Sequence, residues 1–187
     1  MKNSSSEDDT SNVSDGDYAK NSNSGDDTSN VSDGDYAKNS NSGNSNENKS
    51  SGNHAQNSNS GDGTSNVSDG DYAQNSNSGD DTSNVSDGDY AKNSNSGDYA
   101  INISSGDYAQ NSNSGDHARE VITGKNSVCS AIGINSKVKA TKGTWVTLAE
   151  YDSDLKVILV KTEQIDGEIL KEDVYYQLID GKFKEVQ

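Results

Sequence analysis

The sequence predicts an all-β protein, a single-chain β-solenoid (β-helix) followed by a small antiparallel β domain. Three observations support this fold class. A glycine recurs every nine residues from Gly16 to Gly133, fourteen times and without a slip. Two kinds of nine-residue unit alternate, so the true repeat is eighteen residues long. Beyond Thr144 the composition changes, because all five leucines, the only Phe and the only Trp lie there.

The eighteen-residue repeat predicts one solenoid coil made of two half-coils, as in 15–23 and 24–32. We expect each half-coil to be a short strand plus a turn, in which the glycine takes the left-handed conformation and Asp or Asn flanks it. Residues 15–140 are 126 residues, which corresponds to seven coils.

Composition alone predicts a disordered chain, because 27% hydrophobic residues and a net charge of -16 are typical of disorder. A disordered segment has no reason to keep its glycines in phase, although recent duplication also produces such a pattern. The regular phase therefore favours a folded repeat.

The chain divides into three predicted parts: an N-terminal cap or frayed segment at 1–14, a β-solenoid repeat domain at 15–143, and a small antiparallel β domain at 144–187. The first part is assigned as a cap because Glu7 stands where the repeat calls for glycine. Solenoids need terminal caps to cover open strand edges.

Strand alternation predicts which side chains face the solenoid interior. Lys137 and Lys139 belong outside, so their strand neighbours belong inside. In the same register the interior columns are Ala19, Asn21, Asn23 and Thr28, Asn30, Ser32, whereas Tyr18, Lys20, Ser22 and Val31 face outwards. Stacked Asn amides are expected to bond from coil to coil.

Two outward columns are candidate contact surfaces, with packing within the sheet as the alternative. An aromatic column, in which His54 fills the vacant rung, is a candidate partner-binding surface and contains Tyr18, Tyr36, Tyr72, Tyr90 and Tyr108. An aliphatic column, interrupted by Lys49, is a candidate self-association surface and is built around Val31, Val67, Val85 and Ile103. Such a column predicts a weak homodimer that strengthens with added salt.

The C-terminal part predicts strands at 144–151, 155–162, 168–170, 174–179 and 182–186. Tight hairpin turns are expected at Asp166-Gly167 and Asp180-Gly181. The candidate core residues of this part are Trp145, Leu148, Val157, Leu159, Tyr176, Leu178 and Phe183.

Three runs carry a resemblance to a known group of proteins: Gly124 to Gly133, Gly143 to Asp152, and Tyr176 to Gly181. The chain resembles phage and bacterial β-solenoid proteins that pair Asn-(Ser/Thr)-Gly-Asp nonapeptide repeats with a C-terminal β module. The resemblance covers most of the chain and supplies no catalytic residues. More distantly, the Ser-x-Ala-x-Gly pattern is similar to trimeric adhesin heads, whose surface signal and membrane anchor we do not find here.

Acidity is concentrated in the repeat: residues 1–122 hold 21 Asp+Glu and 6 Lys+Arg, and residues 123–187 hold 10 and 9. This distribution predicts a basic, nucleic-acid-binding protein as partner, without direct binding of nucleic acid. The candidate acidic face consists of Asp15, Asp17, Asp26, Asp27, Asp33, Asp35, Asp69, Asp71, Asp80, Asp81, Asp87 and Asp89.

No catalytic residue, metal ligand or cofactor is predicted. His54 and His117 lie 63 residues apart at repeat positions that usually hold Tyr, and Cys129 falls in an interior column. The unit lacks the Gly-Gly-x-Gly-x-Asp order of calcium-binding β-rolls, although Asp15 and Asp17 could form an oxygen-rich turn. We therefore expect a protein that is not an enzyme.

The leading functional hypothesis is a non-enzymatic acidic binding protein, plausibly a phage-encoded inhibitor that mimics nucleic acid and blocks a host defence or DNA-processing protein, of the anti-CRISPR or anti-restriction type. Alternatives are a structural or adhesive fibre segment of a phage particle and a calcium-binding β-roll. The single cysteine and the acidic N-terminal sequence, which has no apolar signal-peptide core, favour a cytoplasmic location, in the host cytoplasm if the chain is phage-encoded. We expect no membrane association.

Overall fold

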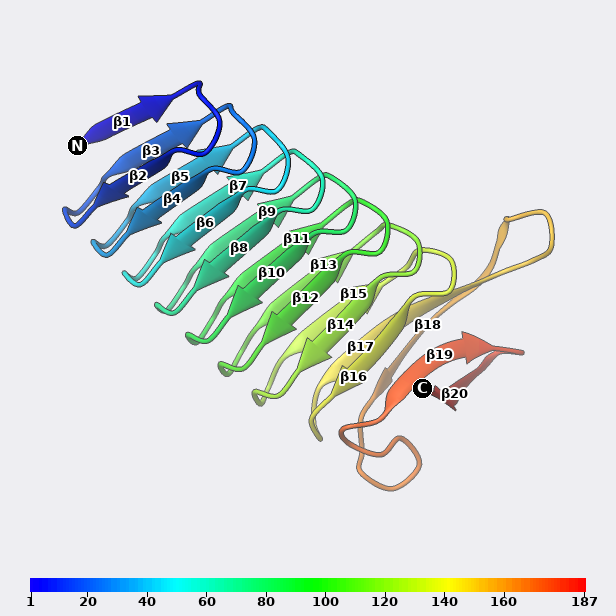
Figure 1. Cartoon of the computed structure of the whole chain (residues 1–187). Helices are drawn as coiled ribbons and strands as arrows, with labels where there is room; N and C mark the ends of the chain where they lie inside the picture. The colour runs from blue at the N-terminus through cyan, green and yellow to red at the C-terminus, as the bar shows by residue number, and fades with distance from the viewer.

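The computed structural model describes all 187 residues, which form two ten-stranded β-sheets wound into one solenoid (Figure 1). Sheet A contains β1 (Lys2–Ser5), β3 (Lys20–Asn23), β5 (Lys38–Asn41), β7 (Gln56–Asn59), β9 (Gln74–Asn77), β11 (Lys92–Asn95), β13 (Gln110–Asn113), β15 (Val128–Ala131), β17 (Trp145–Tyr151) and β18 (Val157–Gln164). Sheet B contains β2 (Ser11–Ser14), β4 (Ser29–Ser32), β6 (Glu47–Ser50), β8 (Ser65–Ser68), β10 (Ser83–Ser86), β12 (Ile101–Ser104), β14 (Arg119–Ile122), β16 (Lys137–Ala140), β19 (Tyr175–Ile179) and β20 (Lys182–Val186).

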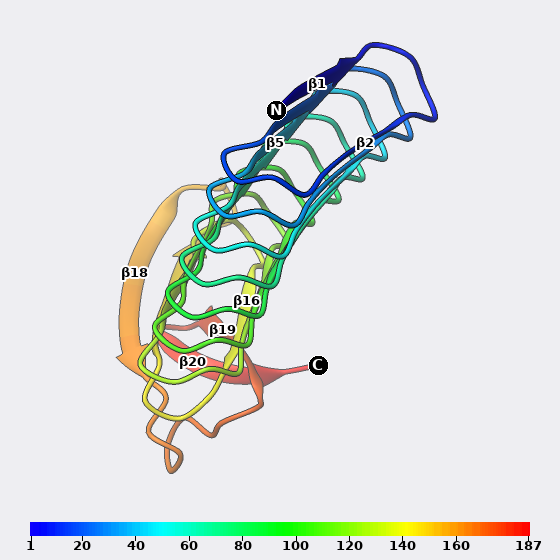
Figure 2. The same ribbon diagram turned by 90° about the vertical axis from the view of Figure 1, so that its left-hand side faces the viewer.

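The eighteen-residue coil is confirmed, because parallel neighbours pair residues eighteen positions apart, as Asn21 does with Asn39. The number of coils is corrected from seven to about eight. Residues 1–14 are not a frayed segment but a regular coil, since β1 and β2 pair in full register with β3 and β4. The coils are stacked as flattened rings from one end of the rod to the other (Figure 2).

The predicted interior is confirmed: each strand from β3 to β13 alternates outward residues with buried Asn or Ser, and a buried Ala, Thr or Asn directly precedes most of the strands. Asn amides form ladders along the rod. In sheet B, for example, the Nδ2 atom of Asn66 lies 3.0 Å from Oδ1 of Asn84, and that of Asn84 lies 3.1 Å from Oδ1 of Asn102. A polar core is stable here because its amides bond to one another.

The predicted reason for the periodic glycines is wrong. They do not take the left-handed conformation; that conformation belongs to the residue two positions later, such as Tyr18 with φ 55°. Glycine is needed because the turns stack too closely for a side chain. A Cβ on Gly79 would lie 2.2 Å from the carbonyl oxygen of Gly61 in the preceding coil. Gly16, in the first coil, meets no atom within 4 Å, which also explains why that coil tolerates Glu7 at its other turn.

Residues 144–187 extend both sheets of the solenoid. β17 pairs in parallel with β15, and β18 then pairs antiparallel with β17. In sheet B, β19 pairs antiparallel with β16, and β20 pairs antiparallel with β19 through the predicted Asp180-Gly181 turn. The small antiparallel part of the predicted fold class is therefore present.

Two details of this part were predicted wrongly. Residues 168–170 form no strand, and Asp166-Gly167 is no hairpin turn, because Oδ1 of Asp166 accepts the backbone N–H groups of Glu168, Ile169 and Leu170. Leu148, Tyr176 and Leu178 are buried as predicted, and Phe183 packs against the core half-buried. Trp145, Val157 and Leu159 are exposed instead, while core positions fall to Ile122, Val138, Val146, Ile165 and Leu170.

Candidate interaction surface

The solenoid has two corners, each a stack of turns that joins the sheets. The first corner joins a sheet B strand to the next sheet A strand, as in 15–19, and the second corner makes the return, as in 24–28. The sequence places the same chemistry in both, because each turn from Gly16 to Gly115 carries Gly, then Asp or Asn, then a left-handed residue. The corners therefore display the most regular side-chain arrays of the molecule.

The residue after each glycine bonds to the coil that follows. Oδ1 of Asp71 accepts the backbone N–H of Asp89 at 2.8 Å, and Oδ1 of Asp80 accepts that of Asp98 at the same distance. We call these two arrays the Asp ladders. The first-corner ladder contains Asp17, Asp35, Asn53, Asp71, Asp89 and Asp107. The second-corner ladder contains Asp8, Asp26, Asn44, Asp62, Asp80, Asp98 and Asp116.

The predicted acidic face is distributed over both corners. Eight of its twelve residues lie at the first corner (Asp15, Asp17, Asp33, Asp35, Asp69, Asp71, Asp87 and Asp89), and Asp26, Asp27, Asp80 and Asp81 lie at the second. Sequence reasoning missed further members of the rows, among them Asp8, Asp62, Asp98, Asp107 and Asp116. The signal that could have found them is their position directly after a periodic glycine or, for Asp8, after the Glu7 that replaces it.

The aromatic column lies at the first corner as a continuous stack. Its six rings are 4.7 to 5.0 Å apart between centroids and within 10° of parallel, with His54 between Tyr36 and Tyr72. Partial burial within the stack raises the pKa of Tyr90, and the neighbouring Tyr72 and Tyr108 raise it further. Since the ring faces cover one another, the column presents ring edges and hydroxyl groups to its surroundings.

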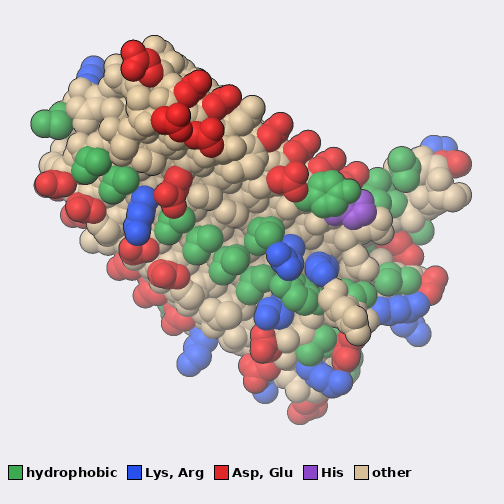
Figure 3. Space-filling view, viewed as in Figure 1, with side chains coloured by type: hydrophobic (Ala, Val, Ile, Leu, Met, Phe, Trp, Pro, Cys, Tyr) green, Lys and Arg blue, Asp and Glu red, His purple; other side chains and the backbone are tan.

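The outer face of sheet B is bordered by acidic side chains on two sides and has an apolar column between them (Figure 3). Val31, Val67, Val85 and Ile103 are each half-buried against the neighbouring rungs. Beyond this column lie the outward residues Arg119, Lys137 and Lys139. Part of this basic group is already paired, because Lys139 contacts Asp173 at 3.0 Å and Lys137 donates to the backbone oxygen of Gln187 at 2.7 Å.

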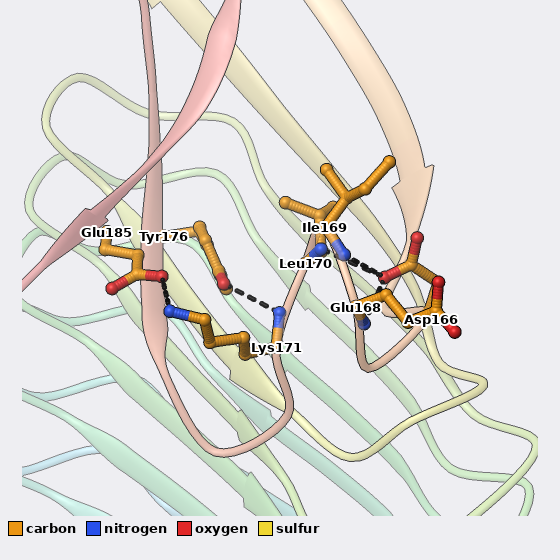
Figure 4. Close-up of polar contacts among 7 residues, drawn as sticks. All are labelled: Asp166, Glu168, Ile169, Leu170, Lys171, Tyr176 and Glu185. Carbon is orange, nitrogen blue, oxygen red and sulfur yellow. Dashed lines mark hydrogen bonds and ion pairs between the residues drawn. The ribbon is translucent and has the colours of Figure 1, made fainter.

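A hollow of about 300 Å³ lies between the two terminal strands, β18 and β20, and is lined by Lys161, Phe183 and Ile169 among others. The loop beside it is held by three sets of contacts (Figure 4): the Asp166 turn, the Lys171 N–H bonded to the Tyr176 hydroxyl, and the Lys171–Glu185 ion pair. Backbone hydrogen bonds lower the pKa of Asp166, and the bond to Glu185 raises that of Lys171. These groups stabilise the loop, and the hollow beside it has Lys161, Glu163, Asp166 and Lys182 in its lining but no His, Cys, Ser or Thr.

The groups with reactive chemistry do not converge elsewhere either. His54 belongs to the first corner, whereas His117 stacks on Tyr99 at the second. Cys129 is buried, and burial raises the pKa of its thiol well above the usual range. No three His, Cys, Asp or Glu side chains are grouped as metal ligands. No helix of the structure is long and apolar enough to cross a membrane.

Comparison with protein-family models, with curated proteins and with solved structures gave no match to this chain.

Proposed function

We propose that this protein is a non-enzymatic binding protein whose acidic corners bind the nucleic-acid-binding surface of a basic partner. The observation that carries the proposal is the choice of Asp over Asn in the Asp ladders. Oδ1 of Asn53 accepts the N–H of Asp71 at 2.8 Å, and Oδ1 of Asn44 accepts that of Asp62 at 2.9 Å. A neutral amide therefore makes the same bond, so the fold does not require the charge carried at the other rungs.

The spacing of the acidic side chains in the more acidic coils is compatible with a nucleic-acid duplex, whereas the coil 51–68 holds only Asp62. The coil that contains Asp69, Asp71, Asp80 and Asp81 carries four carboxylates in one rise of about 4.8 Å, or one per roughly 1.2 Å. A DNA duplex carries one charge per about 1.7 Å of its axis. The four-residue strands that separate the two corners span about 13 Å, close to the roughly 12 Å width of a DNA major groove.

A repeat-rich acidic rod of this kind suits a phage-encoded inhibitor in the host cytoplasm, of the anti-CRISPR or anti-restriction type. Such a protein works by occupying the surface that a defence or DNA-processing protein uses to grip DNA or RNA. The aromatic column at the first corner would add hydroxyl contacts beside the acidic row.

The test is capture of partners from a lysate on the immobilised full chain, followed by elution with increasing salt. We expect a basic partner that elutes early in the gradient and that is displaced by duplex DNA. The test variant combines Asp69→Asn with Asp87→Asn, two exposed changes that lie outside the Asp ladders. It should bind the partner more weakly without loss of fold. A partner retained unchanged at high salt, or bound equally by the double variant, contradicts electrostatic mimicry.

The second candidate is a structural or adhesive fibre segment of a phage particle. It is favoured by the unbroken backbone pairing, which runs in register from β1 to β17 in sheet A and would resist bending. Particle-associated protein that is trimeric in solution would support the fibre, whereas a soluble complex with a basic protein would support the inhibitor.

A further inference from the structure

β18 is the terminal strand of sheet A, and its outer edge faces no other strand (Figure 2). Its first four residues, Val157–Val160, are all aliphatic and are 54, 58, 37 and 54% exposed. The hairpin arm that carries them projects beyond the solenoid, because β17 continues past Leu148, where its pairing with β15 ends.

Both faces of this edge are apolar. Val160 lies opposite Ala149 and Val157 opposite Tyr151, and these two share one face because the pairing shifts by one residue between Glu150 and Tyr151; Leu159, opposite Glu150, lies on the other face. Natural proteins protect edge strands with charges. The terminal strand of sheet B has this protection, since β20 begins Lys182-Phe183-Lys184-Glu185, whereas the first half of β18 has none.

We propose that two copies of this chain associate through antiparallel pairing of β18 with β18 of the second copy. Such pairing satisfies the open backbone edge and covers the aliphatic side chains at the same time. The aliphatic half of β18 can pair with itself: a two-fold axis between Ile158 and Leu159 places Val157 opposite Val160 and Ile158 opposite Leu159 of the other chain.

The charge distribution along the rod selects this arrangement over one in which the solenoids lie side by side. Residues 1–122 carry 21 acidic and 6 basic side chains, but residues 123–187 carry 10 and 9. Joining at β18 continues sheet A from one copy into the next, so the two rods point in opposite directions and only the nearly neutral ends meet. A dimer through the aliphatic column of sheet B would instead bring the two acidic rods together along their length.

This inference is independent of the proposed basic partner, and it is tested by sedimentation of the purified full chain. The chain has a mass of 19.7 kDa, and we expect twice that mass at both about 0.05 M and about 0.5 M salt. Val160→Asp and Ile158→Asp, both at exposed positions, should each weaken the dimer about tenfold or more while the circular dichroism spectrum stays unchanged. Val85→Asp, in the aliphatic column, is the matched control and should leave the dimer intact.

Three results would overturn the inference. One is a chain that remains monomeric at every concentration and salt level. Another is a dimer that is abolished by Val85→Asp and survives Val160→Asp, which would assign self-association to the aliphatic column. The third is a dimer that forms only at high salt, because pairing of the neutral ends does not need the acidic rods to be screened.

Discussion

The side-chain amide of Asn102 donates to Oε1 of Glu120 at 2.8 Å, so an Asn ladder of sheet B ends on a fully buried carboxyl group. The other carboxyl oxygen, Oε2, has no hydrogen-bond partner, and neither has Nδ2 of Asn111 in the same part of the core. From this rung onwards the interior changes from Asn to aliphatic residues such as Val138 and Val146. Glu120 marks the boundary between the polar and the apolar core.

Glu120 should make stability fall as the pH rises. Burial raises the pKa of its carboxyl well above the ordinary value of 4.5, so the folded chain holds a proton that the unfolded chain releases. The contribution is complete below about pH 4.5 and is lost as the pH rises through the folded pKa, at about 1.4 kcal/mol per unit of pKa difference. In urea unfolding, the free energy of unfolding should fall less between pH 5 and pH 8 for Glu120→Gln than for the wild type. Equal pH slopes for the two proteins would contradict the prediction.

Gly79→Ala should destabilise the rod by about 3 kcal/mol or more, because the new Cβ would lie 2.2 Å from a backbone oxygen of the coil below. The matched control is Gly16→Ala, where a Cβ meets nothing within 4 Å. The two proteins are compared by thermal unfolding. A change of similar size in both would show that the glycines act through backbone freedom and not through close stacking.

Asn66→Ala should cost about 3 kcal/mol in the free energy of unfolding, since it removes several bonds of a buried ladder at once. Its Nδ2 donates to Asn77 and Asn84, and its Oδ1 accepts from Asn48 at 3.0 Å. Ser76→Ala, at an exposed position one strand away, should change stability by less than about 0.5 kcal/mol. Urea unfolding of both variants measures the difference, and equal effects would mean that the amide ladders contribute nothing beyond the backbone pairing.

Asp71→Asn should leave stability nearly unchanged, whereas Asp71→Ala should lower it by about 1 kcal/mol. The amide can still accept the N–H of Asp89, as Asn53 does for Asp71 one coil earlier, but Ala cannot. Both changes remove the same charge, so both should lower the affinity for a basic partner equally. Parallel unfolding and binding assays separate the hydrogen bond from the charge. A partner that binds the Asn and Ala variants with different affinities would show that binding depends on the structure of the turn and not on the charge.

The period, the two sheets and the inward columns could be predicted because alternation and repeat length leave one consistent arrangement: if Lys20 is outside, Asn21 is inside. The role of the glycines could not be predicted, because a left-handed backbone and a close approach between coils both require glycine. Nor could Tyr at a positive φ be foreseen, because large side chains disfavour that conformation.

The C-terminal core was missed for a different reason. Trp145 and Leu148 were both expected inside, yet they have opposite parity in one strand, and the structure buries Val146 with Leu148. Applying alternation there would have placed Trp145 outside. The exposure of Val157 and Leu159 follows from their place in a terminal strand, which depends on tertiary pairing and not on local pattern.

Because parallel partners from β1 to β16 lie eighteen residues apart, whole coils are interchangeable units of length. Removing eighteen residues, such as 69–86, should shorten the rod by one rise of about 4.8 Å and leave both ends in their original orientation. Removing only nine, such as 69–77, would exchange the sheets for every later strand and would put Tyr90 and Tyr108 in line with Asp27 and Ser45. Gain or loss of eighteen-residue repeats would therefore change the length of the rod in steps of one coil without changing its fold.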